Sequence, residues 1–177
     1  MNGQYKDILN LIELKQYAKA KNFLKKLLEK NKEDFYIYQL LGVIYYNTGN
    51  IDKSIKYYNL SLNIKSENAG VLLNLGIIYR SLNDLMKAKK FILKSIEVDP
   101  NFLNSYLNMT NIYEIEKNYV KANEYYQKAF SVKQNHPDLI RAYSNFLVKI
   151  GETTKAMSII YKNFGNIRFG KSNLEIK

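Results

Sequence analysis

Few side chains in this sequence are suited to covalent or metal chemistry. The single histidine, His136, directly precedes Pro137, and there is no cysteine, which excludes nitrogen–sulfur metal sites and cysteine–histidine nucleophilic catalysis. Glu114 and Glu116 are two residues apart, so on a helix their carboxylates do not face one another. No glycine-rich phosphate loop is present. We therefore predict no catalytic residues, no metal and no cofactor, and hence a protein that is not an enzyme.

The composition favours a folded, helical and basic protein. The chain has 177 residues, of which 46% are hydrophobic, and this is enough for an ordered core. Two prolines and eight glycines are few, which favours long helices. The net charge of +11 suits a nucleic-acid or acidic partner, although an excess of Lys, Asn, Ile and Tyr explains it equally well as compositional bias.

Targeting signals are not evident in the sequence. Residues 1–15 carry polar side chains every few positions, unlike the apolar core of a signal peptide. No stretch approaches the roughly 18 apolar residues that a membrane span needs. We expect a soluble, cytoplasmic protein without a membrane span.

A 34-residue interval recurs along the chain. Small or hydroxyl-bearing residues at this spacing each follow a large residue: Gly42, Gly76, Thr110 and Ser144. A second series at the same spacing is Ala20, Ser54, Ala88, Ala122 and Ala156. A fixed interval of this size indicates stacked copies of one supersecondary unit. The sequence stays in register in units 1–34, 35–68, 69–102, 103–136 and 137–170, followed by a tail, 171–177.

Each unit is predicted to form two helices of about thirteen and fourteen residues. In 35–68, one helical face is formed by Tyr38, Leu41, Ile44 and Tyr45, and a second by Ile51, Ile55, Tyr58 and Leu62. Gly49 separates them, because glycine readily adopts the left-handed conformation that ends helices. The small residues are expected to let the two helices approach closely.

These residues resemble the tetratricopeptide repeat family over about 170 residues. The best-matching units carry the family's large, Leu-Gly-like, Tyr-like and Ala-like positions, as in Leu72, Leu75-Gly76, Tyr79, Ala88, Ile92 and Pro100. The ends depart from the pattern: Asp7 and Ile8 replace Leu and Gly, and Asn163 replaces Ala. The resemblance implies an all-α fold, an α-solenoid of about five helix-turn-helix repeats coiled into a right-handed superhelix.

The resemblance also implies a peptide-binding groove lined by the first helix of each repeat. The matching positions are Tyr36, Gln39, Tyr46, Asn47, Leu73, Asn74, Ile77, Arg80, Leu107, Asn108, Asn111, Arg141 and Asn145. Asn74 and Asn108 share one repeat position, so they are expected to form a ladder that pairs with peptide amides, although asparagine-rich composition explains them too. The carboxylate clamp of some family members is not expected, because Gln39 and Asn104 stand at two of its positions.

The predicted function is a non-catalytic scaffold that binds a peptide or protein segment in this groove. Two alternatives remain open: an RNA-binding helical array that uses the basic surface, and an accessory module of a transferase. The last repeat is expected to leave some apolar residues partly exposed: Met157, Ile160, Tyr161 and Phe164. The tail, a partner or a second copy would cover them, so self-association through this repeat is a further possibility.

Overall fold

The computed structural model describes residues 3–164, 167–169 and 174–176. The chain divides into two compact units, Met1–Val98 and Asp99–Lys177, which we call unit 1 and unit 2 and describe separately. No helix within the described ranges has the length and apolar character needed to cross a bilayer.

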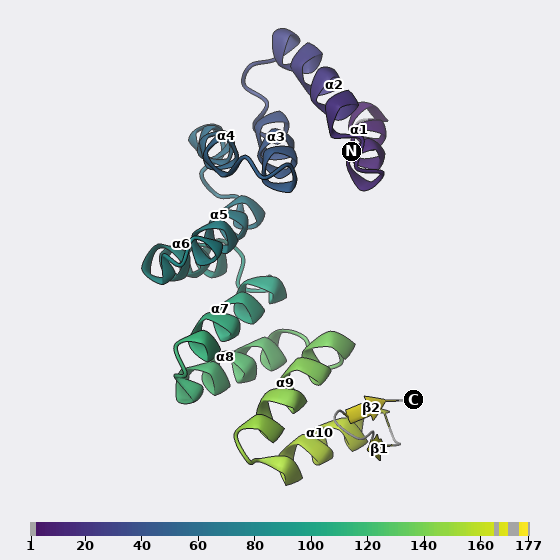
Figure 1. The fold of residues 1–177 in the computed structure, drawn as a ribbon, viewed down its shortest axis with the longest axis vertical. Coiled ribbons are helices and arrows are strands. Elements are labelled where there is room, and N and C mark those ends of the chain that lie inside the picture. Colours follow the sequence, from purple (N-terminus) through teal and green to yellow (C-terminus); the bar gives the residue numbers. More distant parts are fainter. Residues whose placement is uncertain (1–2, 165–166, 170–173, 177) are drawn as a thin grey trace. The chain divides into compact units, whose positions relative to one another are not determined.

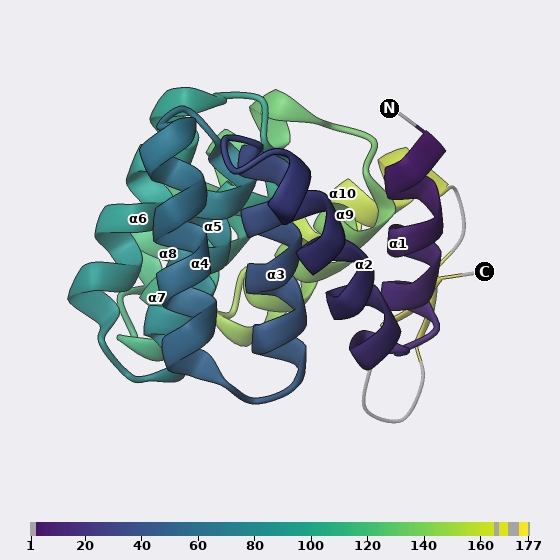
Figure 2. The same ribbon diagram turned by 90° about the horizontal axis from the view of Figure 1, so that it is seen from above.

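Unit 1 consists of three helix pairs (Figure 1). In chain order its helices are α1 (Gly3–Glu13), α2 (Tyr17–Lys30), α3 (Phe35–Asn47), α4 (Ile51–Ile64), α5 (Ala69–Ser81) and α6 (Leu85–Val98). Each pair is an antiparallel hairpin, as α3 and α4 show in Figure 2. Consecutive pairs also pack together, because α2 contacts α3 and α4 contacts α5.

Unit 2 contains two helix pairs and a small strand pair (Figure 1). Its helices are α7 (Leu103–Ile115), α8 (Tyr119–Val132), α9 (Pro137–Lys149) and α10 (Thr153–Phe164). The strands β1 (Ile167–Phe169) and β2 (Leu174–Ile176) pair antiparallel, with Arg168 opposite Glu175. The all-α prediction is confirmed for the body of the fold; β2 falls in the predicted tail.

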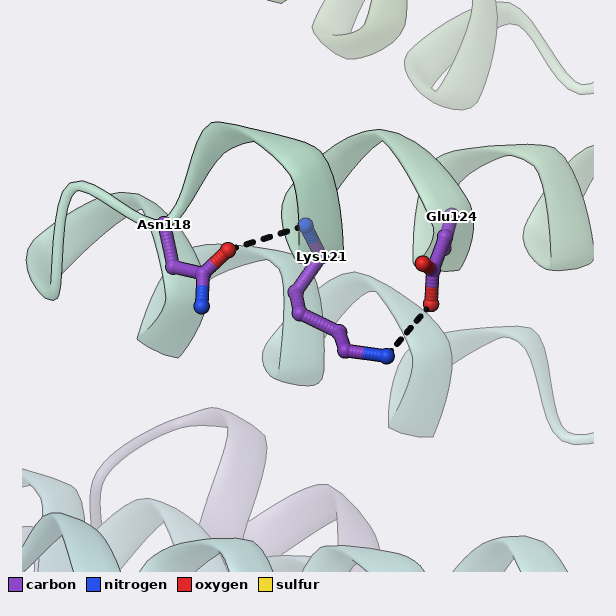
Figure 3. Close-up of polar contacts among 3 residues, drawn as sticks. All are labelled: Asn118, Lys121 and Glu124. Atoms are coloured by element: carbon purple, nitrogen blue, oxygen red, sulfur yellow. Dashed lines mark hydrogen bonds and ion pairs between the residues drawn. The ribbon is translucent and has the colours of Figure 1, made fainter.

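Helix lengths and starting points follow the predicted register. Helices α3, α5, α7 and α9 have 13 residues each, and α4, α6 and α8 have 14. Helices α3, α5, α7 and α9 begin at the first residue of their predicted units. Most second helices are preceded by a polar cap: in Figure 3 the Asn118 side chain accepts a hydrogen bond of 3.1 Å from the Lys121 amide at the start of α8. The Lys121 ammonium in turn lies 3.0 Å from Glu124.

The small residues allow close packing within the pairs, as predicted. A Cβ on Gly42 would lie 2.6 Å from the Tyr58 ring, and one on Gly76 would lie 2.5 Å from Ile92. Both distances are too short for non-bonded carbons, so glycine is required for these helices to approach. At the end of the stack Ile8 occupies the equivalent position and is itself 1% exposed.

Serine hydroxyls supplement this packing at repeated positions. Ser61 donates to the Phe35 carbonyl at 2.9 Å, and Ser95 donates to the Ala69 carbonyl at 2.8 Å. Each bond joins the second helix of a repeat to the start of its first helix. Because the hydroxyls are buried, these bonds satisfy groups that would otherwise be costly to bury.

The expected exposure of the last helix is correct in part. Tyr161 is 67% exposed, and Met157 and Phe164 are half-buried. Ile160, however, is 1% exposed, so the expectation that it is partly exposed is wrong. It lies on the same side of α10 as the buried Ala156, four residues earlier, and faces the core of its own repeat.

Candidate functional site

The predicted groove residues of unit 1 lie on α3 and α5. On α3, Tyr36, Gln39 and Tyr46 are half-buried and Asn47 is exposed. On α5, Asn74, Ile77 and Arg80 are half-buried. We call these seven residues the α3–α5 surface. Half-burial suits a recognition surface, because such side chains are held in place and still present atoms to a ligand.

Leu73 departs from the prediction. It is 4% exposed, and its neighbours Val71 and Leu72 are also buried. Three consecutive buried residues cover a wide arc of a helix, since each is rotated about 100° from the last. Leu73 therefore belongs to the core and offers no surface to a ligand, which corrects its assignment as a groove contact.

A small cavity opens on the α3–α5 surface. Tyr46 of α3, Tyr58 of α4, and Asn74 and Ile77 of α5 line it, and its volume is about 60 Å³. The Asn74 Nδ2 atom donates a hydrogen bond of 3.2 Å to the Tyr58 hydroxyl. The cavity thus combines an oriented amide with aromatic and aliphatic walls.

Tyr58 reaches this cavity from α4. Its ring lies against Gly42, and the residue is 2% exposed. Burial raises the pKa of the Tyr58 hydroxyl above its ordinary value, so the hydroxyl stays neutral in alkaline solution as well. The sequence identified Tyr58 as a packing residue and gave no role to its hydroxyl. Tyr58 occupies the same repeat position as Ile92, 34 residues later, but carries a hydroxyl. This hydroxyl is the signal in the sequence that indicates a polar role.

Other contacts fix the rest of the surface. Asn68 accepts a hydrogen bond of 3.2 Å from the Val71 amide, which caps α5, and its Nδ2 donates to Gln39 at 3.0 Å. The Tyr36 ring packs edge-on against Tyr5, with ring centroids 4.9 Å apart. Gln39 and Tyr36 are therefore tied to elements before and after α3.

In unit 2 the predicted groove residues lie on α7 and α9. Leu107 and Asn108 are half-buried, whereas Asn111, Arg141 and Asn145 are exposed. The Asn108 Nδ2 atom donates to the Asn104 carbonyl of its own helix at 2.8 Å, and Arg141 pairs with Asp138 at 3.0 Å. Asn74 and Asn108 thus make different hydrogen bonds, although they share a repeat position. The asparagine ladder stays a prediction.

A polar network joins three helices of unit 2. Glu114 of α7 pairs with Lys149 of α9 at 3.0 Å and accepts a hydrogen bond of 3.0 Å from the Tyr126 hydroxyl of α8. Burial, and then the negative charge of Glu114, raise the pKa of Tyr126. The hydrogen bond from Lys149 to Glu114 raises the pKa of that lysine. The sequence gave no indication that Glu114 and Lys149, which are 35 residues apart, bind each other.

Family models for the tetratricopeptide repeat match residues 11–65, 69–102 and 103–136. The chain belongs to the tetratricopeptide repeat family. The matched ranges cover the repeats in which the 34-residue register and the small residues are most regular. Repeats of this family typically bind other proteins and are typically non-catalytic.

Solved structures support the fold of this tetratricopeptide repeat protein. PilF of Pseudomonas aeruginosa has a TM-score of 0.80 at 20% identity, over 90% of this chain and 72% of that one. MamA of Desulfovibrio magneticus has a TM-score of 0.72 at 14% identity, over 92% of both chains. A tetratricopeptide repeat protein of Thermus thermophilus has a TM-score of 0.70 at 16% identity, over 92% of this chain and 89% of that one. No curated protein matches in sequence. At these identities the likeness concerns the fold alone.

Proposed function

We propose that this protein is an interaction scaffold whose α3–α5 surface binds an extended peptide segment of a partner protein. The observation that carries the proposal is the cavity formed by Tyr46, Tyr58, Asn74 and Ile77. It places one polar side chain between apolar walls, which is the usual composition of a recognition pocket.

Asn74 is the central residue in this proposal. Its Nδ2 donates to Tyr58, and no residue that the structure describes donates to its Oδ1. An asparagine side chain has two donor hydrogens and one acceptor oxygen. Asn74 therefore has an N–H and an oxygen available, which match the C=O and N–H of one peptide unit.

The size of the cavity limits what enters it. Its volume of about 60 Å³ is less than half of the roughly 150 Å³ that an engineered cavity needs to hold benzene. The bound segment would place a small side chain between Tyr46 and Ile77, and its backbone would pair with Asn74. Large aromatic side chains would be excluded.

Binding through this surface is tested by photo-crosslinking. A photoreactive amino acid at Ile77 should crosslink to a bound partner segment, which mass spectrometry of the crosslinked peptide would identify. Asn74→Ala should reduce affinity for that segment about tenfold, because loss of a paired amide costs about 1–2 kcal/mol. The control is Asn59→Ala, which removes an exposed asparagine from α4. If Asn74→Ala binds the segment as tightly as Asn59→Ala does, the proposal is wrong.

A further inference from the structure

A larger cavity lies in unit 2 and shares no residue with the α3–α5 surface. It is bounded by α8, α9 and α10 and has a volume of about 380 Å³. Its apolar and aromatic lining residues are Phe130 of α8, Tyr143 of α9 and Ile159 of α10. We call it the α8–α10 cleft.

Two lysines of α10 border this cleft. Lys155 and Lys162 are both exposed and are seven residues apart, so they project from the same side of the helix about 10 Å apart along its axis. No carboxylate in the described ranges lies within ion-pair distance of either lysine. No Asp or Glu is among the described residues that line the cleft. Among the described residues, the cleft therefore carries two positive charges and no negative one.

Side-chain amides are a second feature of the cleft. Gln127, Gln134 and Asn135 line the cleft, and their side chains make no hydrogen bond to any residue that the structure describes. Each amide carries donors and an acceptor, so together they can pair with the backbone of an extended chain. The cleft thus offers two cations, three side-chain amides and apolar side chains.

We propose that the α8–α10 cleft binds an acidic, extended peptide segment of a partner protein. In the polyproline II conformation, residues three apart lie on the same side of the chain and are separated by about 9 Å. Two carboxylates at that spacing match the separation of Lys155 and Lys162. An apolar side chain on the adjacent side of the segment rests on Phe130 and Ile159.

Charge argues against two other occupants. The segment 165–177 contains Arg168, Lys171 and Lys177 against Glu175 alone, so it does not complement two lysines. A second copy of the chain carries a net charge of +11 and meets the same repulsion. An acidic segment from another protein meets none.

Tyr143 is unsuited to stacking on a nucleic-acid base. Proteins that bind single-stranded RNA stack bases on accessible aromatic faces. Tyr143 is 3% exposed, its ring stacks on Tyr126 at 5.0 Å, and its hydroxyl donates to Asn123 at 2.8 Å. No ring face of Tyr143 is left for a base.

The test measures fluorescence anisotropy with three labelled probes. These are a peptide of repeated Glu-Leu-Pro triplets, its Lys-Leu-Pro counterpart and oligo-uridine RNA. The Glu-Leu-Pro peptide should bind the full chain, and Lys155→Glu/Lys162→Glu should weaken it about tenfold or more, because two attractions become repulsions. The matched control is Lys56→Glu/Lys90→Glu, which makes the same charge change at exposed lysines of α4 and α6. Circular dichroism checks that both variants fold.

Each outcome bears on the inference. A large loss in the cleft variant with a small loss in the control supports it. Equal losses in the two variants, no binding of the acidic peptide, or binding of oligo-uridine alone overturns it. Asn74→Ala should bind the Glu-Leu-Pro peptide normally, so failure of the α3–α5 proposal and failure of this one are distinguishable.

Discussion

One residue in each repeat adopts the left-handed conformation, at the turn between its two helices. The five residues recur every 34 positions with φ between +55° and +88°: Lys15, Gly49, Asn83, Lys117 and Gly151. The sequence indicated a helix break at Gly49, and Asn83 and Gly151 are likewise residue types that tolerate positive φ. It gave no such indication for the two lysines. Their conformation is imposed by the repeat geometry, and their backbone is strained because Cβ lies close to a carbonyl oxygen when φ is positive.

This strain leads to a stability prediction. Lys117→Gly should raise the free energy of unfolding by about 0.5–1 kcal/mol, because relief of the left-handed penalty exceeds the entropy that glycine adds to the unfolded chain. Urea denaturation of the full chain measures the change. Lys133→Gly is the control, since Lys133 follows α8 with an extended backbone (φ −153°) and should gain nothing. A Lys117→Gly protein no more stable than the original would show that the turn is unstrained.

In the pairs α3–α4 and α5–α6, the distance between helices is set by a glycine on the first helix and a large side chain on the second. Gly42 faces the Tyr58 ring, and Gly76 faces Ile92. The pattern of small residues was sufficient to predict close helix pairs. It was insufficient to predict that Tyr58, pressed against Gly42, extends its hydroxyl to Asn74 on the next pair. That contact depends on the distance between pairs, which no local pattern encodes.

The close approach of α3 and α4 yields a prediction for this element. Gly42→Ala should lower the free energy of unfolding by about 1–3 kcal/mol, because the added methyl group overlaps the Tyr58 ring. Gly70→Ala is the matched control: it lies in α5, and the nearest atom to its added Cβ is 3.5 Å away. This control should be as stable as the original or up to about 1 kcal/mol more stable. Equal stability of the two variants, measured by thermal denaturation, would contradict the packing argument.

Over the whole molecule, positive charge is distributed rather than concentrated. Several lysines of second helices lie over aromatic rings of their own hairpins, as Lys53 does over Tyr45 at 5.5 Å and Lys87 over Tyr79 at 5.3 Å. Such contacts hold the ammonium groups close to the protein surface. A net charge of +11 spread in this way provides general attraction to polyanions without a dense basic site.

This distribution yields a prediction for the RNA-binding alternative. Random-sequence RNA should bind weakly at low salt, and the binding should disappear as salt rises from about 50 to 200 mM, because counterion release drives it. Lys56→Glu/Lys90→Glu and Lys155→Glu/Lys162→Glu should weaken it equally. Anisotropy of labelled RNA across a salt series measures both effects. Tight binding that persists at physiological salt would favour the RNA-binding alternative over the scaffold.

The sequence by itself indicated the 34-residue interval, the pairs of helices and the family. These follow from local rules, since helical periodicity, caps and small residues act within about one hairpin of the chain. The tertiary structure alone decided that Leu73 is buried, that Tyr58 holds Asn74, and that Glu114 pairs with Lys149. The α8–α10 cleft likewise arises where side chains of three helices meet. Such features depend on the positions at which long side chains from neighbouring helices end. The 34-residue pattern does not determine these positions, because each repeat carries different side chains.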